Sequence, residues 1–143
     1  MNPWLAHLDN VDLQWIVDAG LPQWYDAGVD VWLNAPFLVL HGRLHRDETW
    51  GHPGGLLGVE AWLMHWPTHA PWHVETPVAG LQLPLQESHR AHWAQALSVA
   101  LAAEARQRAR PEPVEDETEA VSLKFRYITS RLGWVKEDQR RVQ

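Results

Sequence analysis

The sequence predicts a mainly β domain with flanking helices, and two regions of contrasting composition carry this prediction. From residue 21 to about residue 85, short apolar runs alternate with Gly, Pro, Asp and His, and several prolines exclude a long helix. Strands at this spacing, with turns between them, are typical of a small antiparallel sandwich or barrel. Residues 86–110, in contrast, contain neither Gly nor Pro and are rich in alanine, so they predict one long helix.

The strands are expected in four runs. Residues 29–33 alternate apolar and polar side chains, and residues 37–41 form a β-rich run that Gly42 should close. Residues 72–76 and 78–83 are further candidates. The adjacent carboxylates Asp47 and Glu48 indicate a hairpin turn rather than an acid/base pair.

Helices are expected at both ends of the chain. Residues 4–20 predict one or two short helices, which Asp9 or Asn10 can cap and Gly20 should end. The long helix 86–110 has Ser88 as a possible cap and Pro111 as its stop. We therefore divide the chain into a domain over 1–110, an acidic linker over 111–119 and a short tail over 120–143, with a helix at 120–135.

Composition excludes several classes of protein. The 143 residues suit one domain, and the absence of cysteine excludes disulfides, a thiolate nucleophile and Cys-ligated metals. No apolar run is long enough to span a bilayer and the N-terminus has no signal-peptide pattern, so we expect a cytoplasmic protein without membrane contact. Residues 1–84 have a formal net charge of −7 and residues 85–143 one of +1, so we do not expect this chain alone to bind nucleic acid.

Residues 53–76 have a distinctive order of small residues and prolines. They resemble the phosphate-binding cassette of cyclic-nucleotide-binding domains, the sensor fold of the catabolite activator protein family. Six residues fall without a gap on the Pro, Gly, Gly, Ala, Pro and second Ala of that cassette: Pro53, Gly54, Gly58, Ala61, Pro67 and Ala70. The resemblance covers about residues 4–110, and it implies a double-stranded β-helix, or jelly-roll, sandwich with a long C-terminal helix.

The same cassette departs from the family at the positions that hold the ligand. In the family a glutamate accepts a hydrogen bond from the ribose and an arginine neutralises the cyclic phosphate; here Val59 and Thr68 take those places, and Glu60 comes one residue late. The lost charge-assisted contact should cost about 1.5–3 kcal/mol of binding free energy or more. We therefore expect a degenerate pocket that does not bind cAMP or cGMP in the usual way. Its candidate contacts are Gly54, Gly58, Val59, Glu60, Thr68 and His69.

Two apolar stripes are candidate interfaces. In the family, the long helix pairs with its counterpart in a second subunit, so we expect a homodimer through helix 86–110; packing on its own sandwich is the alternative for this stripe. A larger protein could hold the tail helix in a groove. The two stripes consist of Trp93, Leu97, Ala100 and Leu101 on the long helix, and of Phe125, Ile128 and Leu132 on the tail.

Nine histidines raise the question of metal binding. His65, His69 and His73 are four residues apart, but prolines break the helix that would align them. The run from His41 through His45 to Glu48 only approximates a cupin ligand motif, and on the long helix an exposed face accounts for His89 and His92. We expect no metal and no cofactor.

The sequence thus favours a non-catalytic sensor or adaptor module that acts through protein contacts, with regulation as its expected role. The alternatives are a transcriptional-regulator-like sensor for another small molecule and a metal-dependent cupin-like enzyme.

Overall fold

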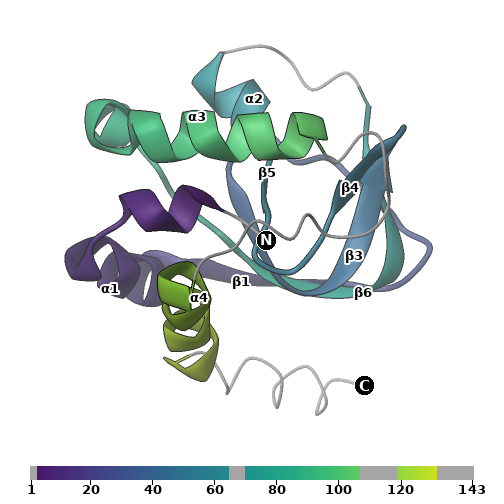
Figure 1. Cartoon of the computed structure of the whole chain (residues 1–143). Coiled ribbons are helices and arrows are strands. Elements are labelled where there is room, and N and C mark those ends of the chain that lie inside the picture. Colours follow the sequence, from purple (N-terminus) through teal and green to yellow (C-terminus); the bar gives the residue numbers. More distant parts are fainter. Residues whose placement is uncertain (1–2, 65–69, 107–118, 132–143) are drawn as a thin grey trace.

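The computed structural model describes residues 3–64, 70–106 and 119–131, and it shows one antiparallel sheet that curls on itself beside a group of helices (Figure 1). The strands run in the order β1-β6-β3-β4, with β2 paired to β6 and β5 paired to β3. This arrangement is the mainly β, jelly-roll-like architecture with flanking helices that the sequence predicts. The strands are β1 (Leu21–Tyr25), β2 (Asp30–Val31), β3 (Phe37–Arg46), β4 (Thr49–Gly51), β5 (Leu56–Leu57) and β6 (Trp72–Gln82).

Two long strands, β3 and β6, form the centre of the sheet. The register between them is irregular near Gly42, and each strand continues past the residue where the sequence predicted its end. Gly42 does not end its strand: it has a positive φ of 83° and lies where the register between β3 and β6 shifts. A Cβ at Gly42 would overlap the carbonyl oxygen of Pro77 on β6. A glycine bulge opposite a proline therefore bends both strands without ending either, so the runs 72–76 and 78–83 form one strand.

The predicted hairpin at Asp47 and Glu48 is confirmed, because these residues form the turn from β3 to β4. Asp47 has a left-handed φ of 55°, which aspartate tolerates better than most residues. Strand β1 was not among the predicted runs, and the predicted strand at 29–33 is shorter, covering Asp30–Val31 in β2.

The N-terminal helices follow the prediction closely. A short 3₁₀ helix, η1 (Pro3–His7), precedes α1 (Asn10–Ala19), and Asp9 is the N-cap. The Asp9 carboxylate accepts a hydrogen bond from the Asp12 amide at 2.9 Å, and Asp12 accepts one from the Asp9 amide at 3.2 Å. This reciprocal capping box satisfies two backbone donors that a helix start leaves unpaired.

The long helix begins later than predicted. A 3₁₀ turn, η2 (Glu87–His89), comes first, so Ser88 lies inside this turn and not at a cap, and α3 covers Arg90–Arg106. Residues 107–110, Pro111 and the predicted linker up to residue 118 lie outside the described residues. The tail helix α4 covers Glu119–Arg131 and packs against α1 and η1. No helix in the described ranges combines the length and apolar character needed to cross a membrane.

Two buried clusters hold these layers together. The larger joins η1, α1 and α3 to the sheet, and it includes the fully buried Trp4, Ile16 and Leu97. The smaller fills the inside of the curled sheet around Phe37 and Trp72. Figure 1 shows α3 lying above η1, with the curled strands beside both. The cassette lies between these two clusters, where the short helix α2 (Val59–Leu63) follows β5.

Candidate functional site

The cassette has the backbone geometry that its glycines predict. Gly54 and Gly58 both have left-handed φ values, of 88° and 73°, which residues with a Cβ rarely adopt. The carbonyl oxygen of Gly54 accepts a hydrogen bond from the indole N–H of Trp4 at 2.9 Å, and its amide donates to Val39 at 2.8 Å. The N-terminal helix and β3 thus fix the loop that leads into α2.

The chain's own backbone covers the second of these glycines. A Cβ at Gly58 would lie 2.5 Å from the carbonyl oxygen of Ala35 and 3.2 Å from the Cβ of Leu33. Glycine is required at position 58 by this internal packing, as well as by its φ.

Val59 points into the protein. It is 0% exposed and belongs to the larger buried cluster, as does Leu56 on β5. The residue at the family's ribose-binding position is therefore part of the hydrophobic core. Val59 was predicted as a candidate contact of the degenerate pocket, but in the structure its side chain is buried.

Glu60 instead forms an ion pair within the chain. Its Oε2 lies 3.7 Å from Nη2 of Arg46, at the end of β3. The Arg46 guanidinium also lies over the ring of Trp72, 4.8 Å from the ring centroid, and its side chain is only 10% exposed. A cation that is nearly buried between an aromatic face and a carboxylate already has its charge balanced.

Thr68 and His69, the other two candidate contacts, lie outside the described residues. A pocket of about 180 Å³ is lined in part by the segment from Leu33 to Ala35, and burial raises the pKa of the Tyr25 phenol in its wall. This volume is below the roughly 300 Å³ at which small-molecule sites usually begin. The lining residues are Tyr25, Trp32, Leu33, Asn34, Ala35, Phe37 and Gln82.

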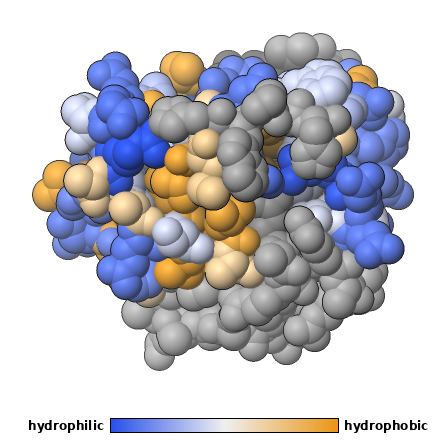
Figure 2. Space-filling view, turned by 90° about the horizontal axis from the view of Figure 1, so that it is seen from above, coloured by the Kyte–Doolittle hydropathy of each residue, from blue (hydrophilic) through white to orange (hydrophobic). Residues whose placement is uncertain are grey.

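The predicted interface stripe of the long helix faces the chain's own core. Trp93, Leu97 and Ala100 are 2%, 0% and 3% exposed, and Leu101 packs partly buried against the same cluster. The alternative interpretation, that this stripe packs on its own domain, therefore accounts for these side chains. Figure 2 shows the molecule from above, on the side of α2 and α3, where hydrophobic residues gather in the middle of the face between hydrophilic ones.

The tail stripe also packs internally. Ile128 is 0% exposed, Phe125 is partly buried against the same cluster, and Leu132 lies outside the described residues. Lys124 fixes the helix further, because its Nζ donates to the carbonyl oxygens of Leu5 at 3.1 Å and Leu8 at 2.6 Å. Assembly with a second copy or a larger partner stays a prediction, and the buried side chains of both stripes are not open to such a partner in this structure.

The two histidines of the long-helix region have local partners. His89 Nδ1 accepts a hydrogen bond from the Gln86 amide at 2.9 Å, and His92 Nε2 lies 2.8 Å from Oδ1 of Asp12 on α1. These contacts stabilise the start of α3. The prediction that His89 and His92 simply lie on an exposed helix face is therefore only partly right.

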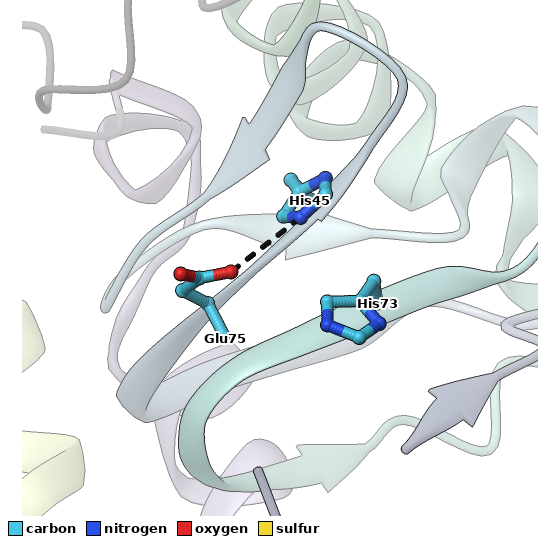
Figure 3. A group of neighbouring side chains, drawn as sticks. All are labelled: His45, His73 and Glu75. Carbon is cyan, nitrogen blue, oxygen red and sulfur yellow. Dashed lines mark ion pairs between the residues drawn. The ribbon is translucent and has the colours of Figure 1, made fainter. Parts of the chain in front are cut away.

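The structure brings together three possible metal ligands that the sequence analysis did not group. His45 on β3 lies beside His73 and Glu75 on β6, and the three side chains point toward one another (Figure 3). His41 and Glu48, which accompany His45 in the sequence, are not in this group. The signal available in the sequence was the His73-x-Glu75 spacing, which places both side chains on one face of a strand.

Comparison with known proteins gives a fold and no sequence family. No protein-family model matches the chain, and no curated protein matches it significantly. Among solved structures, a protein from Geobacter metallireducens described as a cyclic nucleotide-binding protein matches with a TM-score of 0.58 and 16% identity, over 76% of this chain and 93% of that one. The N-terminal domain of a transcriptional regulator from Streptomyces coelicolor matches with a TM-score of 0.52 and 23% identity, over 79% and 96%.

A third match is the regulatory subunit of a cAMP-independent protein kinase A from Trypanosoma brucei. Its TM-score is 0.53 at 21% identity, over 76% of this chain and 42% of that one. A mutant of that subunit with cAMP bound in its A site matches with a TM-score of 0.51 at 20% identity, over 91% and 47%. The fold that the cassette resemblance implied is thus confirmed: the chain has the fold of a cyclic-nucleotide-binding domain.

Proposed function

We propose that this chain is a non-catalytic sensor or adaptor module that has lost the usual binding of cAMP and cGMP and acts through protein contacts. The observation that carries the proposal is the burial of Val59. A ligand cannot reach this side chain without opening the core, and an apolar side chain offers the ribose hydroxyl no hydrogen bond.

The electrostatics of the cassette support the same proposal. Thr68 brings no positive charge to the place of the family's arginine, and Glu60 and Trp72 already engage the guanidinium of Arg46 at the end of β3. A phosphate would have to displace Glu60 from Arg46, so an anion gains less there than at an arginine open to solvent.

The trypanosome kinase subunit provides a precedent for regulation by this fold without the usual ligand. It is described as cAMP-independent, and a mutant of it with three substitutions is described as bound to cAMP. By analogy, we expect that a few substitutions can change whether a domain of this fold binds the nucleotide. The analogy concerns the fold alone, since the identities are 21% and 20%.

Protein contacts are supported by where the exposed apolar side chains lie. Four of the six large hydrophobic residues exposed in the described part of the chain belong to the segment from β1 to just after β2: Leu21, Trp24, Val29 and Trp32. Trp32 is 56% exposed, and exposed tryptophan is typical of the centre of protein interfaces.

The proposal is tested by calorimetric titration of the full chain with cAMP and cGMP, beside the variant Thr68→Arg. We expect no binding by the wild type up to 1 mM nucleotide, and a gain in affinity of about tenfold or more for Thr68→Arg, because a charge-assisted contact contributes about 1.5–3 kcal/mol. Thr68→Lys serves as a control for charge without the bidentate geometry of arginine. Micromolar binding of either nucleotide by the wild type would overturn the proposal.

Assembly is tested separately, by light scattering of the wild type and of Trp24→Ser and Trp32→Ser. If the protein is a homodimer through this exposed segment, the two variants should be monomers that melt at the wild-type temperature. A dimer that both variants preserve would place the contact elsewhere.

A further inference from the structure

A row of side chains crosses four strands on the outer face of the sheet, and its members on the first three strands are polar. Asp30 on β2 is the register partner of His73 on β6, His73 pairs in turn with His45 on β3, and His45 pairs with Trp50 on β4. The neighbouring pair Leu44 and Val74 is fully buried inside the curled sheet. Because successive residues of a strand face opposite sides, the row of His45 and His73 faces outward.

Glu75 completes a group of three possible metal ligands. It lies two residues after His73 on β6, on the same face, and one nitrogen or oxygen atom from each of His45, His73 and Glu75 lies within 4.8 Å of the others. Nε2 of His45 is 3.6 Å from Oε2 of Glu75. Figure 3 shows the two histidine rings and the carboxylate converging from β3 and β6.

These separations suit a shared ion. Zinc lies about 2.0–2.2 Å from histidine nitrogen and carboxylate oxygen, so two ligands at a tetrahedral angle are roughly 3.4 Å apart. The 3.6 Å between His45 and Glu75 is close to that value, and it is too long for a direct hydrogen bond. Rotation of exposed side chains by about 1 Å would bring the widest pair to the same distance.

Asp30 adds an independent observation. Its Oδ1 lies 2.9 Å from Nδ1 of His73, and since an ionised carboxylate only accepts, the imidazole must donate from Nδ1. In the neutral ring, the Nδ1–H tautomer that this bond favours leaves Nε2 with a free electron pair. Metal-binding histidines almost always have such a carboxylate or carbonyl partner, which orients the ring and raises its basicity.

We propose that His45, His73 and Glu75 form a site for a divalent transition-metal ion, with zinc as its best candidate, and that Asp30 positions His73. Two histidines and one carboxylate are the protein ligands of open zinc sites and of other divalent transition metals. The side chains of His73 and Glu75 are 43% and 41% exposed, so the remaining coordination positions face solvent and accept water or a ligand atom. The site is separate from the cassette and does not depend on the function proposed above.

Calorimetric titration of the full chain with Zn²⁺ tests this proposal. We expect one ion per chain, and at least tenfold weaker binding in His45→Ala, His73→Ala and Glu75→Gln. Asp30→Asn keeps all three ligands, and we expect it to lose about 10- to 100-fold in affinity because it holds His73 less well. His41→Ala, an exposed histidine on the same strand, is the matched control and should bind as the wild type does.

Two further measurements make the result decisive. The absorption of bound Co²⁺ should show the intense visible bands of a low-coordinate site, and these bands should disappear in His45→Ala but not in His41→Ala. Mg²⁺ should not compete, because imidazole ligands favour transition metals. The proposal is overturned if Zn²⁺ does not bind below 1 mM, or if His45→Ala and His73→Ala, shown by circular dichroism to be folded, bind it like the wild type.

Discussion

Asp12 on α1 and His92 on α3 lie 2.8 Å apart, from Oδ1 to Nε2, although 80 residues separate them in the sequence. The Asp12 residue is 7% exposed, and its other carboxylate oxygen closes the capping box with Asp9. One nearly buried carboxylate thus joins the start of the first helix to the long C-terminal helix.

Removing the histidine should therefore destabilise the whole domain. His92→Ala leaves one oxygen of a nearly buried carboxylate without its partner, and we expect the free energy of unfolding to fall by about 1–3 kcal/mol. Urea denaturation measures this loss. His41→Ala removes an exposed histidine from β3 and should change stability by less than about 0.5 kcal/mol. Equal stability of His92→Ala and the wild type would show that the contact contributes nothing.

Leu97→Ala should be strongly destabilising in the isolated protein. The side chain is 0% exposed, and truncation of a buried leucine typically costs about 2–5 kcal/mol. The neighbouring exposed Ser98→Ala is the control on the same helix turn. If Leu97 instead formed a contact between two chains, its truncation would lower the association constant and leave the stability of the monomer unchanged.

Val59→Glu, the substitution that would restore the family's glutamate, should destabilise the fold by about 3–5 kcal/mol, since it places an uncompensated carboxylate in the core. Met64→Glu, just after the same helix and 44% exposed, should be nearly neutral. Thermal unfolding monitored by circular dichroism compares the two. A Val59→Glu protein as stable as the wild type would mean that this side chain can turn outward, and it would weaken the proposed loss of nucleotide binding.

Gly42→Ala and Gly28→Ala form a matched pair, because both glycines have positive φ values, of 83° and 91°. An alanine at position 28 meets no atom within 4 Å, so only its backbone strain counts, about 1–2 kcal/mol. At position 42 the new Cβ also meets the Pro77 carbonyl, so we expect a clearly larger loss. Equal losses in chemical denaturation would show that the bulge has room for a side chain.

The stability of the protein at acidic pH should depend on Asp9. The backbone hydrogen bond from Asp12 lowers the pKa of the Asp9 carboxyl below its ordinary value of 3.8. The folded state therefore binds this proton less readily than the unfolded chain, so the contribution is complete above pH 3.8 and is lost as the pH falls through the lowered pKa. The melting temperature of Asp9→Asn should vary less between pH 5 and pH 2 than that of the wild type. The same pH dependence in Asp9→Asn and the wild type would show that the Asp9 carboxylate does not contribute.

Local patterns determined most of the elements of this protein. The capping of the first helix at Asp9, the hairpin turn at Asp47 and the apolar stripe of the long helix all follow from residues close together in the chain, and each is present in the structure. The order of glycines and prolines in the cassette carried the resemblance that implied the fold of a cyclic-nucleotide-binding domain. Glycine permits left-handed φ values that other residues avoid, and proline fixes φ, so both kinds of residue mark the backbone locally.

The tertiary structure decided which surfaces these patterns face. The sequence contains the apolar stripe of Trp93 and Leu97, but only the packing shows that η1 and the sheet cover it. A helix has the same apolar pattern whether that stripe packs in a core or in an interface between chains. From the sequence, Gly42 is expected to end a strand. In the structure it forms a bulge instead, because its backbone lies close against Pro77 on the neighbouring strand. His45 and His73, 28 residues apart, become neighbours only through the register of β3 and β6, and a register is a property of two strands together that neither specifies alone.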